Sequence, residues 1–313
     1  MTVRIATRGS DLALAQATNV AARVRATLGV ETELVVIKTT GDRIQQIPLA
    51  EIGGKGLFVK EIEEALLEGR ADLAVHSGKD LPAATAQGLA LVAFPEREDP
   101  CDALVARSAG DTLMTLRRGA RVGTGSVRRS ALLRAARPDL EIVPLRGNVP
   151  TRIAKIASED LDGVILASAG LKRLGLGSQL TERIAPEIML PAVCQGTLAL
   201  EARRDDSLAR DLAALDDPRT ALTVRAERGF QAELEGDCSV PIAAYCELLE
   251  NDQISLRGLV ASLDGTRIVR AECTAEASEA EQAGRQLARK VLGSGGAEIL
   301  ASLQDHSKLE KPE

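Results

Sequence analysis

The sequence has few aromatic residues, no long apolar run and no basic excess, and each shortage excludes a class of function. Its 313 residues include three Phe, one Tyr and no Trp, and the formal net charge is −6. Aromatic platforms for stacking bases are therefore scarce, and an acidic chain is a poor partner for nucleic acid. No apolar run approaches the length of a membrane span, so we expect no membrane association.

Cysteine and histidine usage excludes most disulfide and metal chemistry. The five cysteines are odd in number, scattered and never in C-x-x-C spacing, so neither a disulfide scaffold nor a zinc site is predicted. The two histidines, His76 and His306, are too few for a histidine-based metal site or a Ser-His-Asp triad. We predict no metal. The first residues enter a strand pattern without a signal-peptide core, and we expect a cytoplasmic protein.

A basic stretch, residues 117–155, stands out in this acidic chain. It carries ten Lys and Arg against two acidic residues, a local balance of +8. Within it, the loops VGTGSVRRS (122–130) and LRGNVPTR (145–152) each follow a strand-like run and precede a helix-like one. Backbone N–H groups and a helix N-terminus meet at such junctions, and neighbouring arginines add bidentate donors. We interpret the stretch as an anion-binding cradle; the alternative is a solvated basic face.

A second group of polar residues follows the predicted buried strand 71–75. The string HSGKDLP (76–82) places His76, Lys79 and Asp80 at the carboxyl end of that strand. Open α/β sheets bind their ligands at this edge. Asp80 is therefore a candidate catalytic carboxylate, and a surface ion pair with Lys79 is the alternative.

The order of the predicted elements indicates an α/β protein with a small additional domain. Two successive α/β units alternate strands with helices, the strands being expected at 3–7, 33–38, 71–75, 88–94, 102–106, 121–124, 141–145 and 163–167. The segments 95–100 and 190–203 are expected to cross between the units, which would place the site in a hinged cleft. Beyond residue 216, a helix, three alternating strands and a further helix with Ser278 and Glu281 at capping-box spacing predict an α+β domain.

The predicted fold is thus two α/β lobes joined by a double crossover, followed by a small C-terminal α+β domain. Domain 1 is expected at 1–96 with 193–215, domain 2 at 97–192, and domain 3 at 216–313. The glycine-rich segment 39–58 has no helical period, so a lid is expected there, with an exposed loop as the alternative. Cys238 lies between small polar residues rather than in an apolar run, so we expect it to be the accessible cysteine.

Eight strings taken together resemble the porphobilinogen deaminase (hydroxymethylbilane synthase) family. They are TRGSDLALAQ, GGKGLFVKE, HSGKDLP, EREDP, VGTGSVRR, LRGNV, GLKRLG and LEGDCSVPI. Any one of them is weak, but all eight in this order over nearly the whole chain are highly specific. The resemblance implies three domains, of which the first two are similar to periplasmic binding proteins.

The resemblance also implies a transferase of tetrapyrrole and heme biosynthesis. Such an enzyme condenses four porphobilinogen units head to tail on a covalently bound dipyrromethane primer, releases ammonia, and frees hydroxymethylbilane by hydrolysis. It implies a cytoplasmic monomer. Each added pyrrole brings two carboxylates, and unpaired carboxylates in a cleft are costly to desolvate, which accounts for the surplus of arginine.

Individual roles follow by match to the family's motifs. Asp80 matches the catalytic carboxylate, which would assist departure of the amine and stabilise positive charge on the pyrrole nitrogens. Cys238 matches the cysteine that carries dipyrromethane as a thioether, and Lys55 and Phe58 match the lid. Cofactor contacts are implied for Lys79, Asp80, Thr124, Ser126, Arg128, Arg129, Arg146 and Gly147. Substrate contacts are implied for Arg8, Ser10, Arg146, Arg152, Arg173, Gln195 and Gly196.

Some positions depart from the family's pattern. Gly78 stands where a bulky apolar residue is usual, and Cys194 stands where a glycine is common. The other departures are Asp11 for proline, Gly125 for serine, and Asp237 for a small residue. The alternative function is a cytoplasmic solute-binding or sensing protein with the same cleft for a polycarboxylate, which would need neither a reactive cysteine nor a lone carboxylate. A phosphate-ester transferase is a third reading, but a P-loop and a metal-binding acidic cluster are missing from the sequence.

Overall fold

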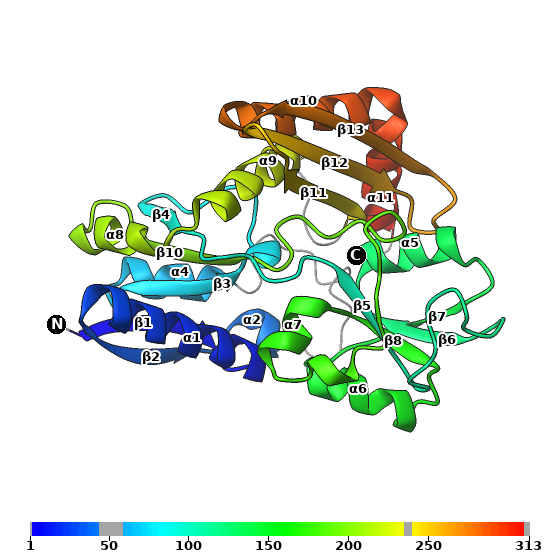
Figure 1. The fold of residues 1–313 in the computed structure, drawn as a ribbon, viewed down its shortest axis with the longest axis horizontal. Coiled ribbons are helices and arrows are strands. Elements are labelled where there is room, and N and C mark those ends of the chain that lie inside the picture. The colour runs from blue at the N-terminus through cyan, green and yellow to red at the C-terminus, as the bar shows by residue number, and fades with distance from the viewer. Residues whose placement is uncertain (1, 44–58, 235–239, 310–313) are drawn as a thin grey trace.

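Three α/β bodies make up the computed structural model, which describes residues 2–43, 59–234 and 240–309. Figure 1 shows the first lobe mainly in blue and cyan with a later segment in yellow-green, the second lobe mainly in green, and the third domain in yellow to red packed across both. Most of the predicted lid, including Lys55 and Phe58, lies outside the described residues, as does Cys238. No helix within the described ranges is long and apolar enough to cross a membrane.

The first lobe is a five-stranded sheet in the order β2-β1-β3-β10-β4. Its strands are β1 (Thr2–Arg8), β2 (Glu31–Ile37), β3 (Leu73–Ser77), β4 (Leu89–Ala93) and β10 (Leu198–Arg203), and its helices are α1 (Asp11–Leu28), α2 (Thr40–Arg43), α4 (Lys60–Leu67) and α8 (Ser207–Leu212). The β1 strand pairs in parallel with β2 and β3, and β10 pairs antiparallel with β3 and β4. The segment 190–203, expected only to cross between lobes, thus ends in a central strand.

The second lobe repeats this arrangement in the order β7-β6-β8-β5-β9. It contains β5 (Asp102–Ala106), β6 (Arg121–Thr124), β7 (Glu141–Pro144), β8 (Gly163–Ala167) and β9 (Glu182–Arg183), with α5 (Val127–Ala136), α6 (Val149–Ser158) and α7 (Ser168–Arg173). Here β5 is the antiparallel central strand. In each lobe, therefore, the antiparallel strand is the one that follows a crossing from the other lobe, and the predicted two-lobed α/β architecture is confirmed.

The third domain packs helices on an antiparallel sheet. Its strands β11 (Ile242–Leu248), β12 (Gln253–Ala261) and β13 (Ile268–Glu276) form a meander, and its helices are α9 (Pro218–Leu234), α10 (Ala280–Val291) and α11 (Ala297–Leu309). Phe230 of α9 is fully buried in the core between them. The predicted capping box is wrong, because Ser278 lies inside a 3-10 turn that precedes α10, and no side chain caps that helix.

Both crossings between the lobes are fastened to α9 of the third domain. Arg97, on the first crossing, donates to both carboxylate oxygens of buried Glu227 at 2.7 and 3.2 Å. Glu227 also accepts the N–H groups of Cys194, on the second crossing, and of Cys246, in β11, at 2.6 and 2.9 Å. A buried carboxylate needs such partners. One side chain therefore ties the third domain to both segments that connect the lobes.

Candidate active site

Asp80 lies on a tight 3-10 turn, Gly78–Asp80, directly after β3. The N–H of Gly78 donates to the carbonyl of Thr197 on the second crossing at 2.9 Å, which fixes the start of the turn. The sequence placed His76 at this rim, but His76 is a buried residue within β3, and its Nε2 lies 3.0 Å from Oε2 of Glu201 on β10. The strand runs two residues further than predicted, so only Lys79 and Asp80 belong to the turn.

A pocket beside this turn gathers polar side chains from neighbouring strands. Its lining includes Arg8, Ser10, Gln16, Ser77 and Asp80. Arg8 ends β1 and Ser77 ends β3, so these parallel strands bring their carboxyl ends to one edge of the sheet, as predicted for a ligand site. The Ser10 hydroxyl caps α1 by accepting the N–H of Ala13, and Gln16 bonds Ser77 at 3.2 Å. The first lobe therefore presents one carboxylate among donors.

Facing it in the second lobe, Arg128 and Arg129 converge on Asp102, which the sequence analysis missed. Arg128 Nη1 donates to Asp102 Oδ2 at 2.7 Å, and Arg129 Nε donates to Oδ1 at 2.8 Å. Gln195, on the second crossing, donates its side-chain amide to Oδ1 at 3.0 Å. Although burial opposes ionisation, the two guanidinium groups hold the pKa of Asp102 far below its usual range.

Arg128 and Arg129 share the single negative charge of Asp102, which leaves an excess of buried positive charge. Further cations lie near these three residues. Burial, followed by repulsion from Arg129, lowers the pKa of Lys79 to about 8. Burial, followed by repulsion from Arg129 and Arg146, lowers the pKa of Arg152 to about 10. Burial also lowers the pKa of Arg173 to about 10. These depressed pKa values indicate too little negative charge nearby, a deficit that an anionic ligand would correct.

The two predicted anion loops follow β6 and β7 and lie against each other. The N–H of Leu145 donates to the carbonyl of Thr124 at 3.1 Å, and the Leu145 carbonyl leaves no space for a side chain at Gly125. Ser126 caps α5, and Asn148, which the sequence analysis did not single out, caps α6. The predicted strand-to-helix location of both loops is confirmed, and the hydroxyl missing at position 125 is explained by this contact.

The second loop and the second crossing are linked to the arginines by backbone carbonyls. Gly147, at φ +116°, accepts Arg152 Nε at 2.7 Å. Gly196, at φ +87°, accepts Arg173 Nη2 at 2.6 Å. A side chain at Gly196 would run into the backbone of Glu98 on the first crossing. Both glycines are thus required by their backbone conformation, and both aim an arginine.

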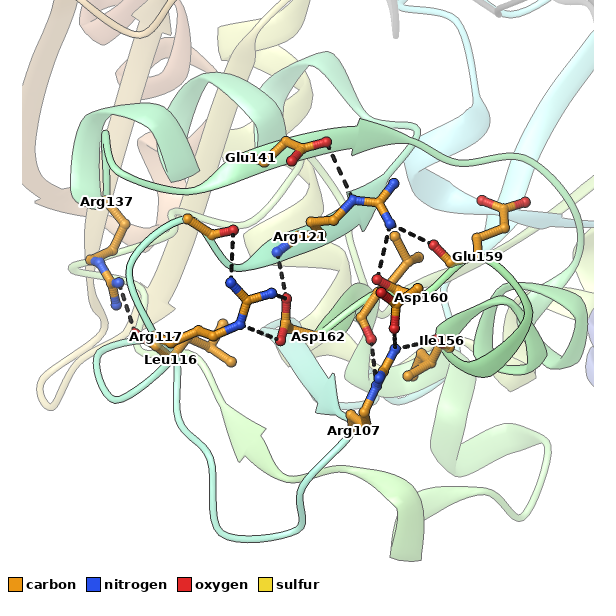
Figure 2. A network of polar contacts seen from close by, with 12 residues as sticks. Arg107, Leu116, Arg117, Arg121, Arg137, Glu141, Ile156, Glu159, Asp160 and Asp162 are labelled. Atoms are coloured by element: carbon orange, nitrogen blue, oxygen red, sulfur yellow. Dashed lines mark hydrogen bonds and ion pairs between the residues drawn. The ribbon is translucent and has the colours of Figure 1, made fainter.

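Several of the ten basic residues of the stretch do not belong to the cradle. Arg134 donates to the carbonyl of Leu263 in the third domain, and Lys155 pairs with Glu159. Figure 2 shows Arg117, Arg121 and Arg137 at the opposite edge of the second lobe. Arg117 pairs with Asp162 at 2.8 Å and Arg121 with Glu141 at 3.3 Å. Arg137 pairs instead with Asp139 at 2.7 Å. The prediction of one continuous cradle is therefore wrong, because Arg121 begins β6 whereas Arg128 and Arg129 follow its end.

The structure thus brings together most of the predicted site residues. Asp80, Lys79, Arg8 and Ser10 come from the first lobe, and the arginines and loop residues Thr124, Ser126, Arg128, Arg129, Arg146, Gly147, Arg152 and Arg173 come from the second, with Gln195 and Gly196 on the crossing. No cluster of His, Cys, Asp and Glu suited to a metal occurs in the part of the chain that the structure describes. The donor set, cations that outnumber the Asp80 and Asp102 carboxylates, suits a polycarboxylate ligand.

Comparison with known proteins adds an independent finding. The family model "Porphobilinogen deaminase, dipyromethane cofactor binding domain" matches residues 3–211, and "Porphobilinogen deaminase, C-terminal domain" matches residues 221–293. The porphobilinogen deaminase of Syntrophus aciditrophicus is 50% identical over 97% of this chain and 99% of its own. That of Geobacter sulfurreducens is 50% identical over 96% of this chain and 94% of its own. Among solved structures, a periplasmic substrate-binding protein from Coxiella burnetii covers 68% of this chain and 91% of its own, at 16% identity and a TM-score of 0.40.

Proposed function

The chain belongs to the porphobilinogen deaminase family, and from that premise we propose which of its residues perform the reaction. It is a transferase of tetrapyrrole biosynthesis that joins four porphobilinogen units head to tail, with loss of ammonia, and releases hydroxymethylbilane. We assign acid–base chemistry to Asp80 and carboxylate binding to the surrounding cations. The observation that supports this most is the excess of positive charge around Asp80 and Asp102, where Arg128 and Arg129 share the Asp102 carboxylate and Lys79 and Arg152 adjoin it.

Asp80 is suited to a reaction that creates and then removes positive charge. When the aminomethyl group of porphobilinogen loses ammonia, positive charge spreads over the pyrrole ring and its N–H. A fixed carboxylate stabilises that charge electrostatically, and after carbon–carbon bond formation it can accept the proton that must leave. Dipyrromethane, when bound, supplies the ring carbon to which the first unit is joined. The hydrogen bond from Gly78 to the second crossing holds the start of the turn that carries Asp80.

The cations bind and orient the acetate and propionate groups. Arg128 and Arg129 are fixed by Asp102, so they keep their geometry without ligand and lose little entropy on binding. The Nε of Arg128 is buried and has no hydrogen-bond partner among the described residues. Lys79 and Arg152 add positive charge near Arg129. These residues fit dipyrromethane, which carries the same carboxylates as the substrate, and we propose that they hold it together with Thr124, Ser126, Arg146 and Gly147.

Binding of carboxylates is expected to weaken as the pH rises above about 8. The pKa of Lys79 is lowered to about 8 without ligand, and the charged form is the one that binds an anion. The affinity for the carboxylate ligand should therefore be constant below about pH 8. Above it, the affinity should fall by up to about tenfold per pH unit, which is the maximum when binding depends on a single proton. Isothermal titration of cofactor-free Cys238→Ser protein with porphobilinogen between pH 6.5 and 9.5 measures this.

The matched control for this pH dependence is Lys79→Arg in the same Cys238→Ser protein. Arginine remains charged over this range, so its profile should be flat. Parallel profiles for the two proteins would assign the pH dependence to another group.

Attachment of the cofactor to Cys238 is expected to be visible in the intact mass of the purified protein. The wild-type chain and Cys273→Ser should both carry the added mass of two linked pyrroles, whereas Cys238→Ser should not. Cys273 is the control because it is the one partly buried thiol among the four free cysteines in the described residues.

If the wild-type protein has only the mass of the polypeptide, it is incubated with preformed hydroxymethylbilane and its intact mass is measured again. Protein that then gains the mass was apoprotein. Protein that still does not gain it would match the alternative, a binding protein that kept the cleft and lost the chemistry.

We further propose the domain limits given above, a monomeric state and a cytoplasmic location. Each of the three sheets falls within one proposed domain. Cys101, Cys194 and Cys246 are buried and unbridged, as is usual where thiols are kept reduced. Lys55 and Phe58 are proposed to act in the lid, and Arg8, Ser10, Arg173, Gln195 and Gly196 to contact substrate. Size-exclusion chromatography with light scattering tests the monomer.

A further inference from the structure

Two of the positions at which the sequence departs from the family's motifs touch each other. A Cβ atom placed on Gly78 would lie 3.0 Å from Cβ and 3.2 Å from the carbonyl oxygen of Cys194, and 3.3 Å from Cβ of Thr197. Carbon atoms in ordinary contact are about 3.5–4.0 Å apart, so a side chain at position 78 would fit only if Cys194 or Thr197 moved by a few tenths of an ångström. Gly78 is not among the residues with positive φ. Glycine is therefore favoured here by the limited space and not by its backbone conformation.

Cys194 has the opposite character. Its φ is +56°, a left-handed conformation that favours glycine over any residue with a Cβ. Its side chain is nevertheless 2% exposed and packs into the core of the third domain with Val224 and Phe230. Burial, followed by the charge of Glu227, raises the pKa of its thiol to about 12, so it stays protonated and is not a nucleophile. What remains for this side chain is to fill space.

The space that it fills lies directly behind the turn that carries Lys79 and Asp80. The turn begins at Gly78, and the backbone that follows it is held by α9. Arg228 of α9 donates to the carbonyls of Pro82 and Ala83 at 3.2 and 2.9 Å. The turn is thus anchored after Asp80 by the hydrogen bonds of Arg228, and before it by the hydrogen bond of Gly78 to Thr197 together with the contact of Gly78 with Cys194. A shift of that contact by a few tenths of an ångström would move Asp80.

We propose that Gly78 and Cys194 form a size-matched pair whose contact positions Asp80. A side chain at position 78 with glycine at position 194 would fill the same volume as glycine at 78 with cysteine at 194. A substitution at one position should therefore be tolerated only with a compensating substitution at the other. Cys194 is a positioning residue in this scheme, since it touches the turn and not the substrate. The proposal rests on the proposed role of Asp80.

The test compares holoenzymes carrying Gly78→Ala, Cys194→Gly, both changes, or Cys194→Ala. Each of the first two should lower kcat by about tenfold through misplacement of the carboxylate, with KM for porphobilinogen changed less than about twofold. The double variant should regain kcat to within about twofold of wild type, as expected of coupled neighbours. Cys194→Ala keeps the contacting Cβ, so it should keep kcat while melting somewhat earlier because of the lost sulfur.

Melting temperatures of the same four proteins give a readout independent of catalysis. Gly78→Ala should lower the melting temperature in the Cys194 background and not in the Cys194→Gly background. Losses of kcat that multiply in the double variant, or full turnover of Gly78→Ala, would overturn the pair. Asp80→Asn is measured alongside. Retained turnover in that variant would refute the role of Asp80, while the coupling of melting temperatures would still decide whether positions 78 and 194 are matched.

Discussion

Replacing Asp80 with alanine or asparagine is expected to lower kcat by about a thousandfold or more, the range for loss of a positioned acid–base and electrostatic group. The fold should survive, because the turn is held by backbone bonds and not by the Asp80 side chain: Gly78 N–H donates to Thr197, and Leu81 N–H to Gly78. Asparagine keeps the shape of the side chain and removes its charge. Single-turnover ammonia release and hydroxymethylbilane formation measure the effect, with the melting temperature recorded beside them.

Asp11→Asn is the matched control for this change. Asp11 is a carboxylate at the start of α1, and its Oδ2 lies 3.4 Å from the side-chain amide of Asn148 in the other lobe. It borders the cleft without belonging to the turn. The control should retain kcat within about twofold, as is usual for a surface change away from the chemistry. If Asp80→Asn behaved like Asp11→Asn, another residue would have to supply the acid–base chemistry.

Periodicity and turn chemistry are enough to predict much of the fold. The ends of α1 follow from local sequence, because Ser10 caps its start and Gly29, at φ +65°, ends it. The strands 102–106, 121–124 and 163–167 coincide with β5, β6 and β8. The hydrophobic pattern of the sequence could not predict the direction of the strand Leu198–Arg203. An apolar run reads the same in a parallel and an antiparallel strand, and only the return of the chain from the other lobe decides between them.

The site was predicted less completely because its key contact joins residues distant in sequence. Asp102 begins the buried run DALVA, and a carboxylate in such a run signals a buried cationic partner. Sequence alone does not say which cation is that partner. The same limit applies to His76, whose partner Glu201 is 125 residues away. By contrast, the split of the basic stretch could have been foreseen, since Arg121 begins a predicted strand and Arg128 follows its end.

Loss of the buried Asp102 carboxylate should also destabilise the protein strongly. In Asp102→Asn, the buried guanidinium groups of Arg128 and Arg129 would face each other without the carboxylate that now pairs with both. Breaking a buried pair in this way costs about 3–5 kcal/mol. For a chain of this size, the melting temperature should fall by about 10 °C. Calorimetry of the cofactor-free protein at neutral pH measures the fall.

The pH range of this effect follows from the depressed pKa of Asp102. The pKa of Asp102 is lower in the folded protein than in the unfolded chain. Such a carboxyl group stabilises the fold at every pH above its unfolded pKa, and this stabilisation is lost as the pH falls through its folded pKa. The deficit of Asp102→Asn should therefore be full at neutral pH and shrink only in strong acid. Asp160→Asn, which removes the exposed partner of Arg107, should leave the melting temperature nearly unchanged.

A bound ligand should reduce the loss of melting temperature caused by Asp102→Asn. This effect distinguishes an anion-binding site from a purely structural ion pair. A polycarboxylate brings negative charge to the same two arginines, so holoenzyme carrying Asp102→Asn should lose fewer degrees than apoprotein, by the linkage between binding and stability. Removing one of the two charges, as in Asp102→Asn with Arg128→Met, should recover part of the apoprotein's loss because less cationic charge stays buried. An equal fall in melting temperature with and without cofactor would mean that Arg128 and Arg129 only hold the second lobe together and do not bind the carboxylates of the cofactor.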